Sequence, residues 1–332
     1  MKKQFIVITT IFPPTKAIQC FNKFTDYQLL IVGDKKTPQN WALDGAFFLS
    51  TSDQEKLDFS INKELPYNHY SRKMVGYLKA IENQAEVIID TDDDNMPKED
   101  WGFPCFDGNY SISTENLGFV NIYRNFSGIN IWPRGFPLNL ITNEKSTLKE
   151  KCLKKQEIRI GVWQGLADGD PDVDAIYRLT TSQMCYFSER QPIALGKGSV
   201  CPFNSQNTAF RKELFSLLYL PSFVSFRFTD ILRGLVAQPI MWQIGYKLGF
   251  LKATVVQERN QHNYLIDFES EIPFYLFSEK IVKLVTSCIN PDNSISENLT
   301  KSYEILSENK IVTKKELSLL AAWLKDLEAL AN

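Results

Sequence analysis

The sequence predicts an α/β fold, in which a sheet of buried strands flanked by helices presents polar side chains where its strands end. Three short apolar runs, at 5–8, 29–32 and 87–89, have the length and β-branched composition of buried strands. Each run is soon followed by hydroxyl or carboxylate side chains. The segment 71–81, before the third run, repeats apolar residues at helical spacing. Strands and helices that alternate in this way are typical of α/β proteins.

The beginning of the chain has the order strand, loop, helix, strand. The first apolar run ends at Thr9 and Thr10, a helix is predicted over 16–24, and the second strand closes at Gly33 and Asp34. Many nucleotide-binding α/β folds begin in this way, with hydroxyls after the first strand and an acid after the second. The order therefore favours a nucleotide-binding sheet.

The helix predicted from residue 71 carries Arg72 and Lys73 in its first turn. Cations are unfavourable at this end of a helix, because the helix dipole is positive there. Two explanations stay open. The side chains are solvated at the surface, or they face an anion.

The predicted strand at 87–89 runs directly into a carboxylate cluster formed by Asp90, Asp92, Asp93 and Asp94. Like charges packed this closely repel one another strongly unless a cation lies among them. Hard oxygen ligands without nearby thiols favour Mg²⁺ or Mn²⁺ over zinc. The alternative is a solvated acidic turn, which the apolar run before it makes less favoured.

Three metal-binding motifs compete for this cluster. A calcium loop of the EF-hand type needs Gly at its sixth position and Glu at its twelfth, where Asn95 and Trp101 stand. A phosphatase of the haloacid dehalogenase type needs Thr or Val where Asp94 stands. The third motif is the Asp-x-Asp of nucleotide-sugar glycosyltransferases, in which a metal bridges the carboxylates and a sugar diphosphate.

Length, composition and charge limit the class of protein. The chain has 332 residues, of which 44% are hydrophobic, enough to bury a large core. Its net charge of −2, with dispersed Lys and Arg, argues against nucleic-acid binding. Its 6 cysteines form no Cys-x-x-Cys pair, so we expect a reducing, cytoplasmic compartment. No run approaches the roughly 18 apolar residues of a membrane span, which leaves only peripheral membrane association open.

A second acidic loop follows an alternating strand at 158–162 and contains Asp168, Asp170, Asp172 and Asp174. It is not a calcium loop of the EF-hand type, because Leu179 stands at the twelfth position. Asp172 is a plausible N-cap for a helix that starts after Pro171. Capping explains one or two of these acids, and four suggest part of a binding site.

Later segments are predicted from their apolar patterns. A strand at 223–228 leads through Asp230 into a helix over 231–248, so Asp230 is either an N-cap or a functional carboxylate. The segment 143–156 is expected to be an exposed helix or linker. Beyond residue 273 the chain becomes helical, with a capping box at 313–316.

Further motifs run through most of the chain in a fixed order. Arg72-Lys73-x-x-Gly76-Tyr77-Leu78 precedes the strand and its Asp92-Asp93-Asp94-Asn95 turn. The other segments are TKAI at 15–18, VGDxKTP at 32–38, LPYN at 65–68, WPRGFPL at 132–138, QGLADGDPDVDA at 164–175, PFNSQNT at 202–208, TDIxRG at 229–234 and ERNxH at 258–262. Together they resemble the STELLO-type family of GT-A-like glycosyltransferases.

The resemblance implies a GT-A-like, Rossmann-like sheet that binds a nucleotide sugar, in a domain over 1–270 with a helical extension over 271–332. It implies Mn²⁺ or Mg²⁺ and a nucleoside-diphosphate sugar as donor, with a UDP-sugar as first choice. The sugar is expected to pass to a hydroxyl acceptor, such as a glycan in polysaccharide assembly.

The resemblance also implies roles for individual residues. The base and ribose would be contacted by Thr9, Thr10 and Asp34. The metal would be held by Asp92, Asp94 and His262, with Asp93 towards the donor sugar. The diphosphate would be met by Arg72, Lys73, Arg134 and Arg259. For the catalytic base of an inverting enzyme, the candidates in order are Asp230, Asp172 and Asp170.

Two other functions stay open at this stage. A nucleotide-sugar mutase uses a similar triple-Asp motif but isomerises the donor without an acceptor. A non-catalytic scaffold would keep the fold to bind a partner, although the presence of Asp92, Asp94, Arg72 and Asp230 together argues against it.

Overall fold

The computed structural model describes residues 2–181, 183–258 and 263–331. The strands are β1 (Gln4–Thr10), β2 (Tyr27–Gly33), β3 (Phe47–Leu49), β4 (Val87–Thr91), β5 (Asn95–Pro97), β6 (Asp107–Ser113), β7 (Gly118–Phe119), β8 (Leu153–Gly169), β9 (Ile193–Ala194), β10 (Ser199–Val200), β11 (Asn207–Arg211) and β12 (Tyr246–Gln257). The helices are α1 (Lys16–Phe21), α2 (Thr51–Lys56), α3 (Lys73–Glu82), α4 (Tyr123–Phe126), α5 (Ala175–Thr180), α6 (Thr229–Gln243), α7 (Tyr264–Cys288), α8 (Ile295–Glu308) and α9 (Lys314–Ala331).

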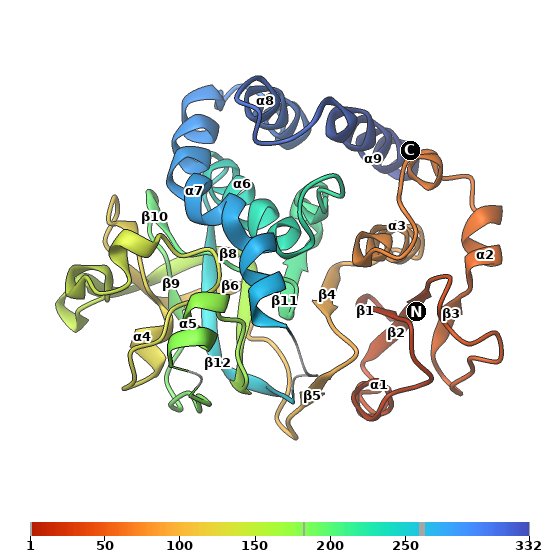
Figure 1. Ribbon diagram of the computed structural model, residues 1–332, viewed down its shortest axis with the longest axis horizontal. Helices are drawn as coiled ribbons and strands as arrows, with labels where there is room; N and C mark the ends of the chain where they lie inside the picture. The colour runs from red at the N-terminus through yellow and green to blue at the C-terminus, as the bar shows by residue number, and fades with distance from the viewer. Residues whose placement is uncertain (1, 182, 259–262, 332) are drawn as a thin grey trace.

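One large mixed sheet runs through the molecule (Figure 1). Within the described residues it contains 10 strands, in the order β3-β2-β1-β4-β11-β8-β6-β9-β12-β5. The strands β3, β2, β1 and β4 are parallel to one another, and β11 pairs antiparallel with both β4 and β8. The prediction of an α/β sheet flanked by helices is confirmed.

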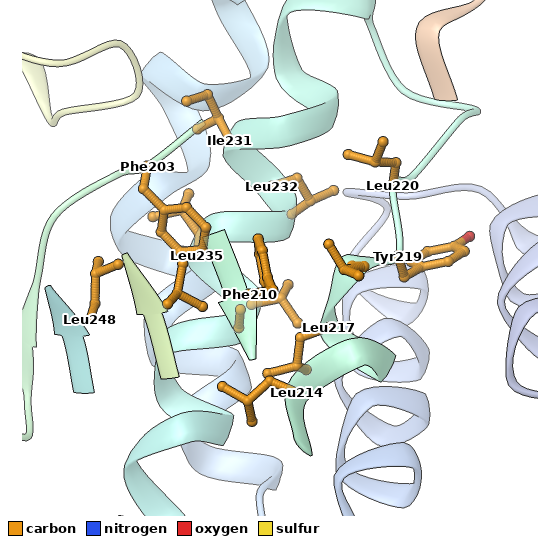
Figure 2. Packing of buried hydrophobic residues seen from close by; sticks show 14 of the residues in the cluster. Phe203, Phe210, Leu214, Leu217, Tyr219, Leu220, Ile231, Leu232, Leu235 and Leu248 are labelled. Carbon is orange, nitrogen blue, oxygen red and sulfur yellow. The ribbon is translucent and has the colours of Figure 1, made fainter. Parts of the chain in front are cut away.

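Alternation along the first strands divides the core between the two faces of the sheet. Val7 faces α3 and belongs to the larger apolar cluster, which also contains residues of α6, α8 and α9. Ile6 and Ile8 belong to the second cluster, with Phe21 of α1 and Trp101. Figure 2 shows how the larger cluster is packed around Phe210 of β11, next to Leu232 and Leu235 of α6.

Helix α3 lies unusually close to β1 and β2 because it carries Gly76 at the point of contact. A Cβ atom at this position would lie 2.6 Å from Cγ2 of Val32 and 2.6 Å from Cγ1 of Val7. The close approach fixes the carboxyl ends of these strands relative to the turn that begins α3.

We expect Gly76→Ala to destabilise the protein by about 1–3 kcal/mol, because overpacking against two buried valines outweighs the gain in helix propensity. Urea unfolding at equilibrium measures this. Gly128→Ala is the matched control, since a Cβ there meets nothing within 4 Å. Equal stability of the two variants would contradict the tight contact.

Three predictions of secondary structure are wrong. Residues 223–228 do not form a strand, but a loop and a 3₁₀ turn, Phe226–Phe228. The helix predicted to reach 248 ends at Gln243, because Gly245, with φ of +79°, turns the chain into β12. For the segment 143–156 the helix alternative is wrong, because the segment forms short 3₁₀ turns and the start of β8.

Helices α7, α8 and α9 contribute buried side chains to the larger apolar cluster. The predicted boundary at residue 270 falls inside α7, which starts earlier than the sequence pattern indicates. In α9, Glu316 was expected to complete a capping box. Its carboxylate instead accepts hydrogen bonds from the backbone N–H groups of Ser222 and Phe223.

A second contact joins α9 to the beginning of the chain. Both carboxylate oxygens of Asp326 accept backbone N–H bonds, from Ser60 at 2.7 Å and from Ile61 at 2.8 Å. None of the helices in the described ranges has the length and apolar composition needed to cross a bilayer.

Candidate functional site

The parallel strands β1, β2 and β4 end at a cavity of about 500 Å³. Because parallel strands point the same way, the residues that follow them meet at one edge of the sheet. This edge contributes Thr9, Thr10, Asp34 and the turn Asp92–Asp94 to the cavity wall. The structure therefore brings together Asp92 and Asp94, two of the three residues expected to hold a metal, and the three residues expected to contact the base and ribose.

The opposite wall comes from segments far away in the sequence. Its members include Arg134, Asp172, Phe226, Asp230 and three residues near the start of α7, namely Ile266, Asp267 and Ser270. The cavity thus lies between the carboxyl edge of the first strands and the helical part of the chain.

Asp90 is separated from the rest of the acidic cluster. It is fully buried in β4, where Lys73 pairs with it at 2.8 Å and Arg233 at 2.7 Å. Burial acts to raise its pKa, but the two cations hold the pKa of Asp90 below its ordinary value. Asp90 is a structural anion that orients the strand, and the next three aspartates face the cavity.

Asp92 and Asp93 carry unusual pKa values. Burial, with the nearby carboxylates of Asp94 and Asp90, raises the pKa of Asp92 to about 7, and Lys73 opposes this shift. Burial also raises the pKa of Asp93, whose carboxylate accepts a hydrogen bond from Thr10. Both shifts arise chiefly from burial of the charged carboxylate, and the neighbouring negative charges add to them.

The donor chemistry of the turn suits a hard divalent cation. Mg²⁺ is usually held by one or two carboxylates together with substrate phosphates, and Asp92 and Asp94 can supply such oxygens. In the part of the chain that the structure describes, no three His, Cys, Asp or Glu side chains are grouped as a complete metal site. The carboxylates fit a metal shared with a diphosphate better than a metal held by protein alone.

Arg72 and Lys73 do not line the cavity. The Lys73 side chain is 0% exposed, and its Nζ donates to Asp90, to the carbonyl of Thr91 and to Asp92. Arg72 donates from Nε to Gln54 at 2.8 Å and lies over the ring of Tyr67. Lys73 therefore affects the cavity through its hydrogen bond to Asp92, which lines it. Arg72 is bonded to Gln54, which lies outside the cavity wall.

Arg134 lies between two carboxylates in the opposite wall. Its Nε and Nη2 donate to Asp172, both at 2.8 Å, and its Nη2 and Nη1 donate to Asp230 at 2.8 and 3.0 Å. All three side chains are buried. The charge of Arg134 is already balanced by these carboxylates, so in this arrangement it is poorly suited to bind phosphate.

Asp230 faces the cavity but is heavily hydrogen-bonded. Besides Arg134, its oxygens accept from the Ser205 backbone N–H at 3.2 Å and from the Tyr70 hydroxyl at 3.3 Å. Together with the bonds from Arg134, these hydrogen bonds occupy both carboxylate oxygens of Asp230. Asp172 shares the same guanidinium, and Asp170, paired with Arg178, does not line the cavity.

Asp174, and not Asp172, is the N-cap of α5. Its side chain accepts from the Tyr177 backbone N–H at 2.8 Å and from the Trp132 indole N–H at 2.7 Å. The prediction of an Asp172 cap is wrong because Pro171 is followed by a further turn before the helix begins. Asp172 is used by Arg134 instead.

Asp174 gives a testable pH dependence. Burial raises its pKa to about 7, so between about pH 4 and 7 the folded chain keeps a proton that the unfolded chain loses. The stabilising contribution is present below about pH 4 and is lost as the pH rises through about 7. We expect the unfolding free energy of the natural protein minus that of Asp174→Asn to fall by about 1–3 kcal/mol from pH 5 to 8.

Urea unfolding at several pH values measures this difference, and any constant effect of the lost Trp132 bond cancels. Asp26→Asn, at an exposed carboxylate, is the control. A difference that does not change with pH would show that Asp174 titrates normally in the folded state.

Arg259 and His262, assigned to the diphosphate and the metal, lie outside the described residues. The sequence analysis missed several cavity residues, among them His69, Tyr70, Phe226 and Gln257. The first two follow the LPYN motif, which was the available signal. Nothing in the local pattern of Phe226 or Gln257 distinguishes them from ordinary core residues.

The fold and the cavity define the class of protein. A large mixed sheet, with an acidic turn at the carboxyl ends of its parallel strands, is a GT-A-like α/β architecture. A family model described as STELLO glycosyltransferases matches residues 227–332. The chain is therefore related to the STELLO family, as its motifs predict.

Two proteins of Arabidopsis thaliana extend the relationship over nearly the whole chain. "Probable glycosyltransferase STELLO2" is 30% identical over 346 residues, and "Probable glycosyltransferase STELLO1" is 30% identical over 348 residues. Each alignment covers 98% of this chain and 44% of the relative. The chain thus spans less than half the length of the curated relatives it matches.

Proposed function

We propose that this protein is a metal-dependent glycosyltransferase that moves a sugar from a nucleoside-diphosphate sugar to a hydroxyl acceptor. One observation carries the proposal. Thr9, Thr10, Asp34 and the Asp92–Asp94 turn lie around one cavity, at the carboxyl ends of neighbouring parallel strands. This is where open α/β sheets bind nucleotides. The names of the relatives agree with the proposal.

Different residues along the cavity are proposed to bind the nucleoside and the metal. Asp34 accepts backbone N–H bonds from Lys35 and His69, which orients its carboxylate for the ribose or base of a UDP-sugar or a similar donor. Asp92 and Asp94 would hold Mn²⁺ or Mg²⁺. The chemistry supplied by such a cation is neutralisation of the charge that develops on the diphosphate leaving group.

The acceptor would enter from the wall that contains Arg134, Asp172 and Asp230. In an inverting reaction, a carboxylate takes the proton of the acceptor hydroxyl as its oxygen attacks the anomeric carbon. Asp230 remains our first choice for this base, because it lines the cavity. Its bonds to Arg134 would have to loosen when the acceptor binds, so that a carboxylate oxygen is free to accept the proton of the hydroxyl. A glycan in polysaccharide assembly is the acceptor class we propose.

Binding and turnover test the proposal in sequence. Calorimetry with UDP, GDP and CDP in the presence of Mn²⁺ identifies the base, and the corresponding nucleotide sugars are then incubated with glycan acceptors. Release of nucleotide that depends on acceptor supports transfer. Conversion of the donor to an isomer would make the protein a mutase. If none of the three nucleotides binds, the proposed site is wrong.

A further inference from the structure

His69 has a fixed tautomer. It is the N-cap of the 3₁₀ turn Tyr70–Arg72, and its Nδ1 accepts the Ser71 backbone N–H at 3.1 Å. A ring nitrogen that accepts a backbone N–H carries no proton itself, so in the neutral ring the proton is on Nε2. Burial lowers the pKa of His69 to about 4, so the imidazole is neutral at neutral pH.

The ring is held in the cavity wall on several sides. It stacks on Tyr70, with ring centroids 5.3 Å apart, and meets the edge of Phe226 at 5.3 Å. The backbone N–H of His69 donates to Asp34 at 3.2 Å. The Nδ1 atom of His69 is hydrogen-bonded to the backbone and the hydroxyl of Ser71. The Nε2 atom has no hydrogen-bond partner among the described residues. A rigid, neutral N–H donor is therefore left for a ligand in the cavity that His69 lines.

We propose that His69 is a ligand-binding residue whose Nε2–H donates to a carbonyl or hydroxyl oxygen in the nucleoside half of a bound nucleoside diphosphate. This inference rests on the proposed function and deepens it. The nucleoside half is favoured because the His69 backbone is bonded to Asp34, at the end of β2 and away from the acidic turn after β4. An uncharged donor also suits a neutral oxygen, whereas phosphate oxygens are bound best by cations.

Two substitutions separate ligand binding from capping. Asparagine places an amide oxygen near the position of Nδ1, so His69→Asn keeps the acceptor for Ser71 but lacks the outer donor. Glutamine places an amide N–H near the position of Nε2, so His69→Gln keeps a donor but weakens the cap. A residue that only caps the turn would tolerate asparagine better than glutamine, and a ligand-binding residue would show the opposite order in affinity.

Calorimetry with UDP, GDP and CDP plus Mn²⁺ is run on the natural protein, His69→Asn and His69→Gln, with inorganic pyrophosphate plus Mn²⁺ as a fourth probe. We expect His69→Asn to weaken the best-bound nucleotide by roughly 3- to 10-fold, with unchanged pyrophosphate affinity. His69→Gln should bind the nucleotide more tightly than His69→Asn does.

Unchanged nucleotide affinity in His69→Asn would overturn this inference alone. An equal loss for pyrophosphate would overturn the assignment to the nucleoside half. If the natural protein binds none of the three nucleotides, the proposed function fails and this inference fails with it.

Discussion

Replacing Arg134 with methionine is expected to lower the unfolding free energy by about 3–5 kcal/mol. The guanidinium is the shared partner of Asp172 and Asp230, and both carboxylates are buried around it. Removal of the cation takes an ion-pair partner from two carboxylates that are largely buried and lie close together. Loss of the cation shared by two buried carboxylates costs more than an ordinary core substitution.

Urea unfolding and Tm measure the effect, with Arg190→Met as the control. Arg190 pairs with Glu150 at the surface, where the two side chains are 35% and 74% exposed, and an exposed pair contributes at most about 1 kcal/mol. The triple variant Arg134→Met, Asp172→Asn, Asp230→Asn should regain part of the lost stability, since it removes the repulsion. If the single variant were as stable as Arg190→Met, the buried charge network described here would be wrong.

The double substitution Asp92→Asn and Asp94→Asn is expected to reduce Mn²⁺-dependent nucleotide affinity by at least about 100-fold, equal to about 2.7 kcal/mol. Amide groups have a similar size but carry no charge, so a cation shared with a diphosphate loses its protein anions. Turnover of the nucleotide sugar should fall at least as much. Calorimetry with and without Mn²⁺ measures the loss.

Stability should change in the other direction in the same variant. Burial and the neighbouring carboxylates raise the pKa of Asp92 despite its ion pair with Lys73, so the double variant should unfold at a Tm equal to or above that of the natural protein. The exposed Asp26→Asn serves again as the control. Retention of Mn²⁺-dependent affinity in the double variant would exclude these two residues as metal ligands.

Local patterns predicted the first half of the fold well. Strands β1, β2 and β4 are buried on both faces and read as continuous apolar runs, which is the signal of parallel strands. The segment 223–228 looked like another such strand, but it forms a loop and a 3₁₀ turn, and the carboxylate of Glu316 accepts a hydrogen bond from the backbone N–H of Phe223. That contact joins residues 93 positions apart, so no local pattern could reveal it.

Local patterns also predicted one part of the candidate site, namely the residues at the ends of the parallel strands. Residues that follow parallel strands share an edge by geometry, so Thr9, Asp34 and Asp92 could be placed together from the sequence. The ion-pair partners of the charged residues could not be predicted from the sequence. Arg134 and Lys73 looked like phosphate ligands, yet each is paired with buried carboxylates that come from other segments.

The bonds between Asp326 and the backbone of residues 60 and 61 have a consequence for cooperativity. They connect α9 to the segment that follows α2. Glu316, in the same helix, accepts a hydrogen bond from the loop before α6. Local opening of either region therefore requires the loss of contacts in α9, so the two regions should open as one unit. Amide protons at Ile61 and Phe223 should exchange with similar protection.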